Sequence, residues 1–598
     1  MNGIGVLVKK IKKRLPEFAV ILMCMVILGV GVSRKEGYHM DELLSFQLSN
    51  AEYNPWIVPT QPEGRLAKFI HNEIDGENAA ETLGNLADTF LDVLQNKGES
   101  KLLSYQADVY EEPVWISSEV FRDYVAVDKD DDFNYLSVYF NVKDDNHPPI
   151  HFMLLHTMSS LFKGAVYPFM GCVINMAAVA VTMVFMMKIG IVLAEILFNG
   201  KGGRMLGIFS AFLYGASAGA LASVLLIRMY GVLTMFCVIL LYLHVKKWAD
   251  GSMKAEDYDK KRGFAGSNLA LIVVTVLGFW TQYFFLFYCM IMAAVTVTLL
   301  LWQKRGKEAV VYIRSMVLAA VIGLGCFPFA ISDVFASERG VEALGNLSSG
   351  LNGYGTRLAA FWNILGKRTF GIGLYGVAAA VIIGMAVAVR KEKRAEADRR
   401  NRIRGCLWLL VAPAVGYFLL AAKMSPYLVD RYIMPLFPLA ALLGMVGVMC
   451  LAYCAEGVRT RKWLMSLLCV AVAVLQLSGL SHYDGSYLYT GYKEQLAFAQ
   501  EYAEYPCICV YDGVGYYENL LEFAQYEETL LVKEAELAER KDIASVREHD
   551  SLVVLVKEEV SVENVCRILK EKYGFVPVKE ILENSVYGDK MLLFSSIN

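Results

Sequence analysis

The sequence lacks several features that would assign it to a common class of enzyme or binding protein. It has no metal-type Cys-x-x-Cys pair, no internal repeat and no nucleotide-binding glycine loop in its tail. Its 12 cysteines are scattered and lie mostly in apolar stretches, which is typical of small packing residues. Cys507 and Cys509 lie two apart in an expected strand, where they share a face and do not readily bridge each other.

The distribution of charged residues argues against a nucleic-acid-binding protein and against a transporter. The formal net charge is −3, so no basic excess points to nucleic acid as a partner. The apolar segments are nearly free of interior charge apart from Lys188 and Glu195, which argues against transport. The tail from Gly485 to Asn598 holds 21 acidic against 11 basic residues, so the rest of the chain is basic. This asymmetry predicts two regions in different compartments.

Long apolar runs dominate what is present. With 56% hydrophobic residues and repeated segments of about 20 apolar residues, the sequence predicts a polytopic α-helical membrane protein. The basic run Lys9–Arg14 precedes a first span at about 18–32 with no cleavage site, which predicts a retained span and a cytoplasmic N-terminus. The later apolar segments are Val166–Met187, Leu206–Ile227, Met229–Val245, Leu269–Tyr288, Met290–Trp302, Met316–Ser332, Phe370–Val389, Cys406–Ala422, Ile433–Ala455 and Leu464–Leu480.

Basic patches between these segments predict the topology. If all of them are cytoplasmic, the chain crosses about eleven times, within a range of about 11 to 13 transmembrane helices, and ends outside. This count treats Ile150–Phe162 as a helix that does not fully cross, since ~1.5 Å per residue gives only about 20 Å. We therefore expect a multi-pass cell-membrane domain at 1–484, with its first extracytoplasmic loop at 33–146, and an extracytoplasmic domain at 485–598.

The tail alternates short apolar runs with polar helical stretches, which predicts a small α/β domain. The expected strands are Cys507–Tyr511, Leu530–Val532, Ser551–Val556, Phe575–Lys579 and Met591–Phe594, and one helix is expected at Val562–Lys572. In the first loop, we expect a helix around Ala79–Gln95.

Two adjacent carboxylates, Asp41 and Glu42, follow the first span by a few residues. One interpretation is a general base, or a metal ligand, at the mouth of a cavity. The alternative is a solvated loop, or the acidic first turn of a helix. Because such a pair is not needed to hold a span in the bilayer, it is a candidate for chemistry at the membrane face.

A group of histidines lies where the first loop re-enters the membrane. The prolines of Asn-His-Pro-Pro at 146–149 favour the first turn of a helix. His147 and His151 are four apart and share a face of that helix, and His156 lies deeper. Since ionisable groups at membrane depth are usually functional, His147 is the stronger candidate and His156 the weaker one. The alternative is a set of interfacial side chains with no role.

Two cationic clusters lie beside apolar segments on the side that the topology assigns to Asp41. One is Arg-Met-Tyr at 228–230, and the other runs from Lys423 to Arg431 and on to Tyr432. An arginine there either snorkels to the surface or binds a phosphate, whose oxygens its guanidinium matches.

These pieces, in this order, resemble the GT-C class of integral-membrane glycosyltransferases. The resemblance is carried by the acidic pair after the first span, HPPIHFMLLHTMSSLF, Arg-Met-Tyr and Asp-Arg-Tyr-Ile-Met-Pro. It is closest to bacterial relatives of the protein O-mannosyltransferases and of the lipid A aminoarabinose transferase, and covers about residues 15–480. The tail matches no family by its motifs.

The resemblance implies an inverting transfer of a sugar from a polyprenyl-phosphate carrier to an extracytoplasmic glycan, lipid or protein. It implies that Asp41 is the general base, with Glu42 in support. The leaving lipid phosphate needs a cation, for which Arg431 is the first candidate and Arg228 and Lys423 follow. His147 stands where the aminoarabinose transferase has Lys-Pro-Pro, and this departure leaves its contact with the same phosphate in doubt.

Aromatic side chains on the outer face are candidates to line a groove for the isoprenoid chain, although an interfacial aromatic belt explains most of them. The expected groove or sugar contacts are Tyr230, Tyr283, Tyr432 and His151. Gln282 precedes Tyr283 where close relatives have His-Tyr, which argues against a histidine-rich metal site there.

No cofactor is required by this interpretation. A divalent metal ion stays open as an alternative, with Asp41, Glu42, His39 and His147 as its candidate ligands. The expected partners are the lipid-linked sugar, the acceptor and the lipid bilayer. The rival functions are a glycan ligase or polymerase, a transporter, and a non-catalytic membrane scaffold.

Overall fold

The computed structural model describes residues 3–96, 99–104, 109–128, 131–250, 263–392, 397–453, 455, 457–543, 550–582 and 585–597. The chain forms two compact units, each built from separate stretches of sequence. The membrane unit comprises Met1–Ser33, Asp145–His151 and Gly171–Ser486. The loop-and-tail unit comprises Arg34–Asp144, Phe152–Met170 and Tyr487–Asn598.

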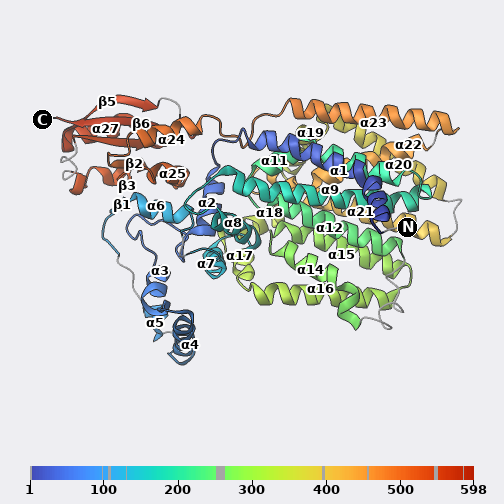
Figure 1. Cartoon of the computed structure of the whole chain (residues 1–598), viewed down its shortest axis with the longest axis horizontal. Helices are drawn as coiled ribbons and strands as arrows, with labels where there is room; N and C mark the ends of the chain where they lie inside the picture. The colour runs from blue at the N-terminus through green and yellow to red at the C-terminus, as the bar shows by residue number, and fades with distance from the viewer. Residues whose placement is uncertain are drawn as a thin grey trace. The chain divides into compact units, whose positions relative to one another are not determined.

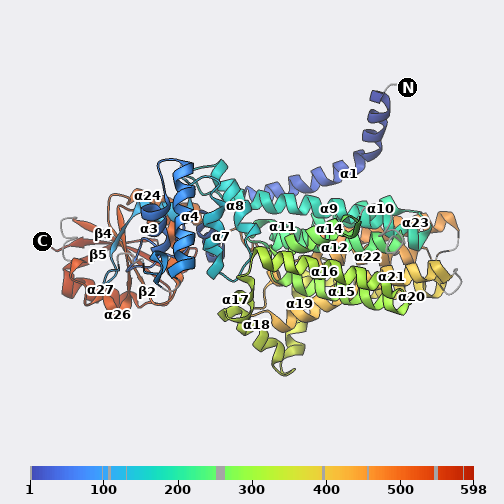
Figure 2. The ribbon, with the colours of Figure 1, turned by 90° about the horizontal axis from the view of Figure 1, so that it is seen from below.

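Long apolar helices make up the membrane unit, and seven in the described residues are long and apolar enough to cross a membrane. They are α1 (Gly3–Val32), α9 (Pro168–Phe198), α12 (Tyr230–Ala249), α15 (Phe284–Trp302), α16 (Gly306–Cys326), α21 (Ala397–Met424) and α23 (Val458–Ser481). Two shorter apolar helices are α14 (Gly263–Phe279) and α22 (Leu436–Ala452). Figures 1 and 2 show α12, α15, α16 and α21 running alongside one another.

One segment that the sequence predicts as a single span, Leu206–Ile227, is broken in the structure, and a second bend lies at the start of the expected segment Phe370–Val389. Helix α10 (Gly203–Gly215) meets α11 (Ala218–Leu225) at 56°, and α19 (Tyr354–Arg368) meets α20 (Leu374–Glu392) at 120°. At the first break the hydroxyl of Ser217 accepts the Ala220 N–H and so starts a new helix. Hydropathy does not show the first break, because the apolar pattern continues through it, whereas the second break follows the polar residues Lys367, Arg368 and Thr369. Counting each bent pair as one span gives up to nine crossing candidates in the described residues.

Glycines let the helices of this unit pack closely. A Cβ placed on Gly190 of α9 would lie 2.4 Å from the backbone nitrogen of Gly207 in α10. A Cβ on Gly447 of α22 would lie 2.8 Å from the Cα of Val381 in α20. Small residues at such crossings are typical of helix packing in membranes.

A six-stranded mixed sheet forms the centre of the loop-and-tail unit, with the strand order β1-β3-β2-β4-β6-β5. The strands are β1 (Trp115–Ser117), β2 (Cys507–Tyr511), β3 (Glu528–Lys533), β4 (Ser551–Val556), β5 (Phe575–Leu582) and β6 (Lys590–Ser596). Strands β3, β2 and β4 are parallel, and the remaining pairs are antiparallel. The core packs Val565 and Leu569 of α27 (Val562–Tyr573) against the apolar side chains of the strands.

The expected fold class, a helical membrane protein with a small α/β domain, is confirmed. The domain division differs from our expectation, because the first loop belongs to the unit that contains the tail. Strand β1 of the loop pairs with β3 of the tail, so these segments share one sheet and therefore one compartment. The loop helices are α2 (Met40–Asn50), α3 (Arg65–Phe69), the π-helix η1 (Ile70–Ile74), α4 (Ala79–Asn96), α5 (Lys101–Ser104), α6 (Ser118–Val125), α7 (Tyr135–Asn141) and the 3-10 helix η3 (Val142–Asp144).

Further short helices complete the described structure. In the membrane unit these are α17 (Ala330–Phe335), α18 (Glu338–Ser348), η4 (Gly371–Gly373) and η5 (Asp430–Ile433). In the tail they are α24 (Tyr492–Glu501), η6 (Gly515–Asn519), α25 (Leu520–Phe523) and α26 (Glu534–Leu537). Helix α8 (Ile150–Leu161) has 12 residues and is not among the crossing candidates. The helix expected at Ala79–Gln95 corresponds to α4.

Candidate active site

The acidic pair lies in the first turn of α2, and the structure gives its two members different environments. Glu42 is fully buried and its Oε2 accepts the backbone N–H of His39 at 2.8 Å. In return, His39 Nδ1 accepts the backbone N–H of Asp41 at 3.0 Å, which completes a reciprocal cap of the helix. The helix-start interpretation therefore applies to Glu42, and the catalytic interpretation falls on Asp41, whose side chain is 22% exposed.

Lys35 is a buried partner of Glu42 that the motifs in the sequence do not reveal. Its Nζ donates to Glu42 Oε2 at 2.9 Å and to the carbonyl of Tyr487 at 2.7 Å. Both side chains of the ion pair have no exposed surface. Because Tyr487 belongs to the tail, 452 residues away in sequence, this ammonium joins the tail to the helix that carries Asp41.

The tail holds the segment before α2 at three more points. The N–H of Glu36 donates to the Leu488 carbonyl at 2.8 Å, and the Glu36 carboxylate accepts the N–H of Gly491 at 2.6 Å. The Tyr587 hydroxyl donates to the Tyr38 carbonyl at 2.8 Å. These bonds fix the backbone that leads into Asp41.

The membrane unit contains a hydrogen-bonded chain of three polar side chains at the start of α8 and of α12. His147 Nδ1 lies 2.9 Å from Asp145 Oδ2, and His147 Nε2 lies 3.3 Å from Arg228 Nη2. His147 therefore lies between a carboxylate and a guanidinium and contacts both. Burial works against the charged form of Asp145, but His147 and Arg228 outweigh it and lower the pKa of this carboxyl.

The two cationic clusters of the sequence meet through their aromatic residues. The rings of Tyr230 and Tyr432 lie 6.2 Å apart edge to face, and the ring of Phe284 stacks on Tyr432 at 5.1 Å. The Arg431 guanidinium lies 5.5 Å from the centre of the Tyr432 ring. The structure therefore brings the Arg-Met-Tyr segment and the Arg431 segment together, with three aromatic rings between them.

Arg368, which the motifs in the sequence do not single out, neutralises Asp430, the acidic neighbour of Arg431. Its Nε donates to Asp430 Oδ2 at 2.7 Å, its Nη1 to Asp484 at 3.0 Å and its Nη2 to Ser486 Oγ at 3.0 Å. Asp430 thus has its own cation. The signal available in the sequence was the position of Arg368 at the end of an amphipathic stretch followed by glycines.

Lys423 occupies a different place from the phosphate contact that we expected. Its Nζ donates to the Ser349 carbonyl at 3.0 Å, to Ser349 Oγ at 2.8 Å and to the Gly350 carbonyl at 2.8 Å. An ammonium has three N–H donors, so this loop engages all of them. The geometry argues against Lys423 as a phosphate ligand.

The remaining expected contacts differ in exposure. Tyr283 donates its hydroxyl to Asp333 of α17, so it braces a short helix. His151 is fully buried, and burial together with the charge of Arg228 lowers its pKa to about 3, which keeps the imidazole neutral. His156 is also buried, so a direct sugar contact is not expected for either histidine.

The candidate metal ligands have other roles or belong to different units of the structure. Among the described residues, no three His, Cys, Asp or Glu side chains cluster closely enough to hold an ion. His39 and Glu42 are engaged in capping α2, while His147 belongs to the membrane unit.

Fold and site together define a polytopic helical membrane protein with an α/β unit, carrying a buried guanidinium–imidazole pair near the ends of its spans. No protein-family model and no curated protein matches the sequence. Two crystal structures of ArnT from Cupriavidus metallidurans are similar, one in the apo state and one bound to undecaprenyl phosphate. Both are 12% identical to this chain and cover 76% of it and 88% of their own length, with TM-scores of 0.43 and 0.45. ArnT is the lipid A aminoarabinose transferase, a glycosyltransferase of the class that the sequence motifs resemble.

Proposed function

We propose that the protein is a membrane glycosyltransferase that moves a sugar from a polyprenyl-phosphate carrier to an extracytoplasmic acceptor. The observation that carries the proposal is the buried Arg228, held by His147 and two residues before Tyr230, whose ring packs against Tyr432. A guanidinium binds phosphate oxygens in a fork, and aromatic rings beside it suit an isoprenoid chain or a sugar face. Such a combination at the ends of apolar helices suits a ligand that is half lipid and half phosphate.

The reaction that we propose is a single displacement. The acceptor hydroxyl attacks the anomeric carbon while its proton passes to the carboxylate of Asp41. The bond between the anomeric carbon and the phosphate oxygen breaks, and the lipid phosphate leaves with one more negative charge. Arg228 and Arg431 stabilise that charge, so no general acid is needed for the leaving group. Attack opposite to the leaving group inverts the configuration at the anomeric carbon.

Binding of the lipid phosphate tests the proposal directly. The purified full-length protein is titrated with undecaprenyl phosphate and, for comparison, with undecaprenol. We expect saturable binding of the phosphate that is at least about tenfold tighter than binding of the alcohol, because the guanidinium contributes only to the first. Equal affinity for the two lipids would contradict the proposal.

A transporter is the second candidate, because broken helices are typical of transporters. The break between α19 and α20 follows Arg368, but that guanidinium already pairs with Asp430 and Asp484. Helix α11, after the other break, contains no charged side chain. Uptake of a lipid-linked or free sugar into proteoliposomes, without release of polyprenyl phosphate, would favour this alternative.

A further inference from the structure

A pocket of about 430 Å³ lies at one edge of the sheet in the loop-and-tail unit. This volume falls within the range of about 300–1,000 Å³ that is usual for small-molecule sites. Pro59 and Thr60 form one side, and Tyr511, Lys533 and Glu536 form the other. The pocket has no part in the reaction described above.

The place of the pocket in the fold is one that favours ligands. Tyr511 and Lys533 are the last residues of the parallel strands β2 and β3, and they face each other in the register of the sheet. In open α/β sheets, ligands bind beyond the carboxyl ends of parallel strands.

The first loop supplies the opposite wall, which hydrogen bonds hold in place. The N–H of Tyr110 donates to the Thr60 carbonyl at 3.0 Å, and the N–H of Val114 donates to the Pro59 carbonyl at 3.0 Å. Arg540 of the tail donates to the Pro113 carbonyl at 2.6 Å and thereby ties the two walls together. The pocket is therefore formed before any ligand arrives.

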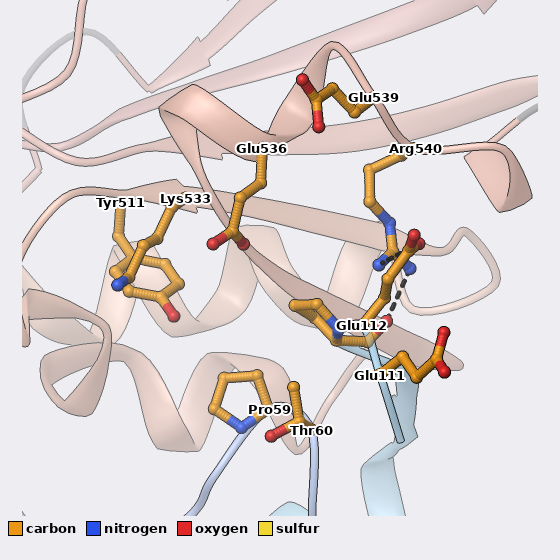
Figure 3. A pocket seen from close by; sticks show the side chains of 10 residues that line it. Pro59, Thr60, Glu111, Glu112, Tyr511, Lys533, Glu536, Glu539 and Arg540 are labelled. Carbon is orange, nitrogen blue, oxygen red and sulfur yellow. Dashed lines mark hydrogen bonds and ion pairs between the residues drawn. The ribbon is translucent and has the colours of Figure 1, made fainter.

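Polar groups without partners line this pocket. Tyr511 is only 6% exposed, and within the described part of the chain its hydroxyl makes no hydrogen bond. Lys533 and Glu536 likewise form no ion pair with any residue that the structure describes. Figure 3 shows the Tyr511 hydroxyl and the Glu536 carboxylate directed into the space over Pro59 and Thr60. A phenol and a carboxylate that open onto the same space can both bind the hydroxyl groups of one ligand.

The mixture of groups selects the chemistry of that ligand. Four glutamates and two cations line the pocket, and Glu112 pairs with Arg540, which leaves the carboxylates of Glu111, Glu536 and Glu539 with Lys533 as the other cation and disfavours an anion. These carboxylates point in different directions instead of converging as ligands of one cation do (Figure 3). A basic peptide would leave the lysine without an acceptor. Saccharide hydroxyls both donate and accept, so they satisfy the carboxylates, the ammonium and the phenol together.

We propose that this pocket binds a neutral saccharide. Its volume accommodates one or two sugar rings, and its walls join the first loop to the tail. The proposal that the pocket binds a saccharide is independent of the proposed function. The further step, that this saccharide is the acceptor of the transfer, rests on the proposed function.

The test is a binding assay on the full-length protein in detergent. The protein is applied to an array of neutral, acidic and basic glycans, and the strongest neutral ligand is titrated in solution. We expect Tyr511→Phe and Glu536→Gln each to weaken its binding about fivefold, because the first removes a hydrogen bond and the second replaces a charged acceptor by a neutral amide. Glu571→Gln serves as the matched control, since this carboxylate on α27 is 62% exposed and pairs with Arg567.

Three results would overturn the proposal: no neutral glycan binds, only acidic or basic glycans bind, or the pocket variants bind as tightly as the control. Binding of Ca²⁺ that displaces the glycan and survives Tyr511→Phe would also overturn it, in favour of a cation site. Undecaprenyl phosphate is titrated on the same samples. Loss of lipid binding in Arg228→Ala with glycan binding intact separates the two proposals, so that either one can fail alone.

Discussion

The Nζ atom of Lys35 lies 2.9 Å from Oε2 of Glu42, and neither side chain has any surface exposed. The same Glu42 oxygen accepts the backbone N–H of His39 at the start of α2. One carboxylate therefore caps the helix that carries Asp41 and compensates a buried ammonium. We infer that Glu42 acts on the chemistry only by positioning its neighbour.

Removal of one member of this pair should destabilise the protein strongly. Glu42→Leu leaves Lys35 buried without its counter-charge, and we expect a loss of about 3–5 kcal/mol in the free energy of unfolding. The double variant Lys35→Met/Glu42→Leu should lose less than Glu42→Leu alone, because no buried charge remains. Thermal unfolding of the three proteins in one detergent measures this. A double variant that is less stable than Glu42→Leu would contradict a compensating ion pair.

Asp41→Asn should leave the fold and the lipid affinity intact and remove most of the transfer rate. Asparagine cannot take the proton of the acceptor, so we expect kcat to fall by about 10²–10⁴ with little change in the affinity for undecaprenyl phosphate. The measurement is release of polyprenyl phosphate from a lipid-linked sugar in membranes. If a normally expressed Asp41→Asn protein retains full activity, Asp41 is not the base.

Arg228→Ala should weaken the binding of undecaprenyl phosphate by about 10- to 100-fold, because a charge-assisted hydrogen bond is lost. Arg431→Ala should act in the same direction. Lys423→Ala should leave the affinity unchanged, since its donors are engaged by Ser349 and Gly350. A larger effect of Lys423→Ala than of Arg228→Ala would reverse our assignment of the cations.

Stability should depend on pH through Glu522 of α25, which is fully buried. Burial raises the pKa of this carboxyl to about 7, against the hydrogen bonds from Tyr492 and Gln495 that favour its charged form. In the native state the group therefore keeps its proton at a pH where the unfolded chain has lost it. The free energy of unfolding should fall as pH rises from about 4.5 to about 7, by an amount on the order of 3 kcal/mol. Glu522→Gln should make the stability less dependent on pH, which melting temperatures across that pH range measure. If the slope is unchanged in this variant, the pH dependence arises from other groups.

Chelation should not stop the transfer. We propose that Arg228 and Arg431 stabilise the leaving phosphate without a metal ion, so the initial rate in EDTA should equal the rate without it. Restoration of a lost rate by added Mn²⁺ or Mg²⁺ would instead support the metal interpretation of Asp41 and His39.

The sequence predicted the regular elements well where local pattern determines them. Strands β2 and β4 begin and end at the expected residues, because each is a short apolar run between polar stretches. Helix α27 was expected from its polar periodicity and extends one residue beyond the expected end.

Local sequence patterns did not predict the contacts between distant segments of the chain. Strand β1 has three residues, too few to show alternation, and it exists because β3 offers it an edge. Lys35 and Arg368 look like ordinary span-end cations, and only their partners Glu42 and Asp430 show that they are buried structural charges. The bends between α10 and α11 and between α19 and α20 depend on tertiary packing, which hydropathy does not record.

The pairing of β1 with β3 has a consequence for how the protein is made. Pro113, beside β1, and Arg540, which binds its carbonyl, are 427 residues apart, and all the later membrane helices are synthesised between them. At about 5–20 residues per second, the loop waits roughly 20 to 85 seconds for the strand that completes its sheet. During that interval the residues of β1 have no strand to pair with, so the loop reaches its final structure only after the last membrane helix has been made.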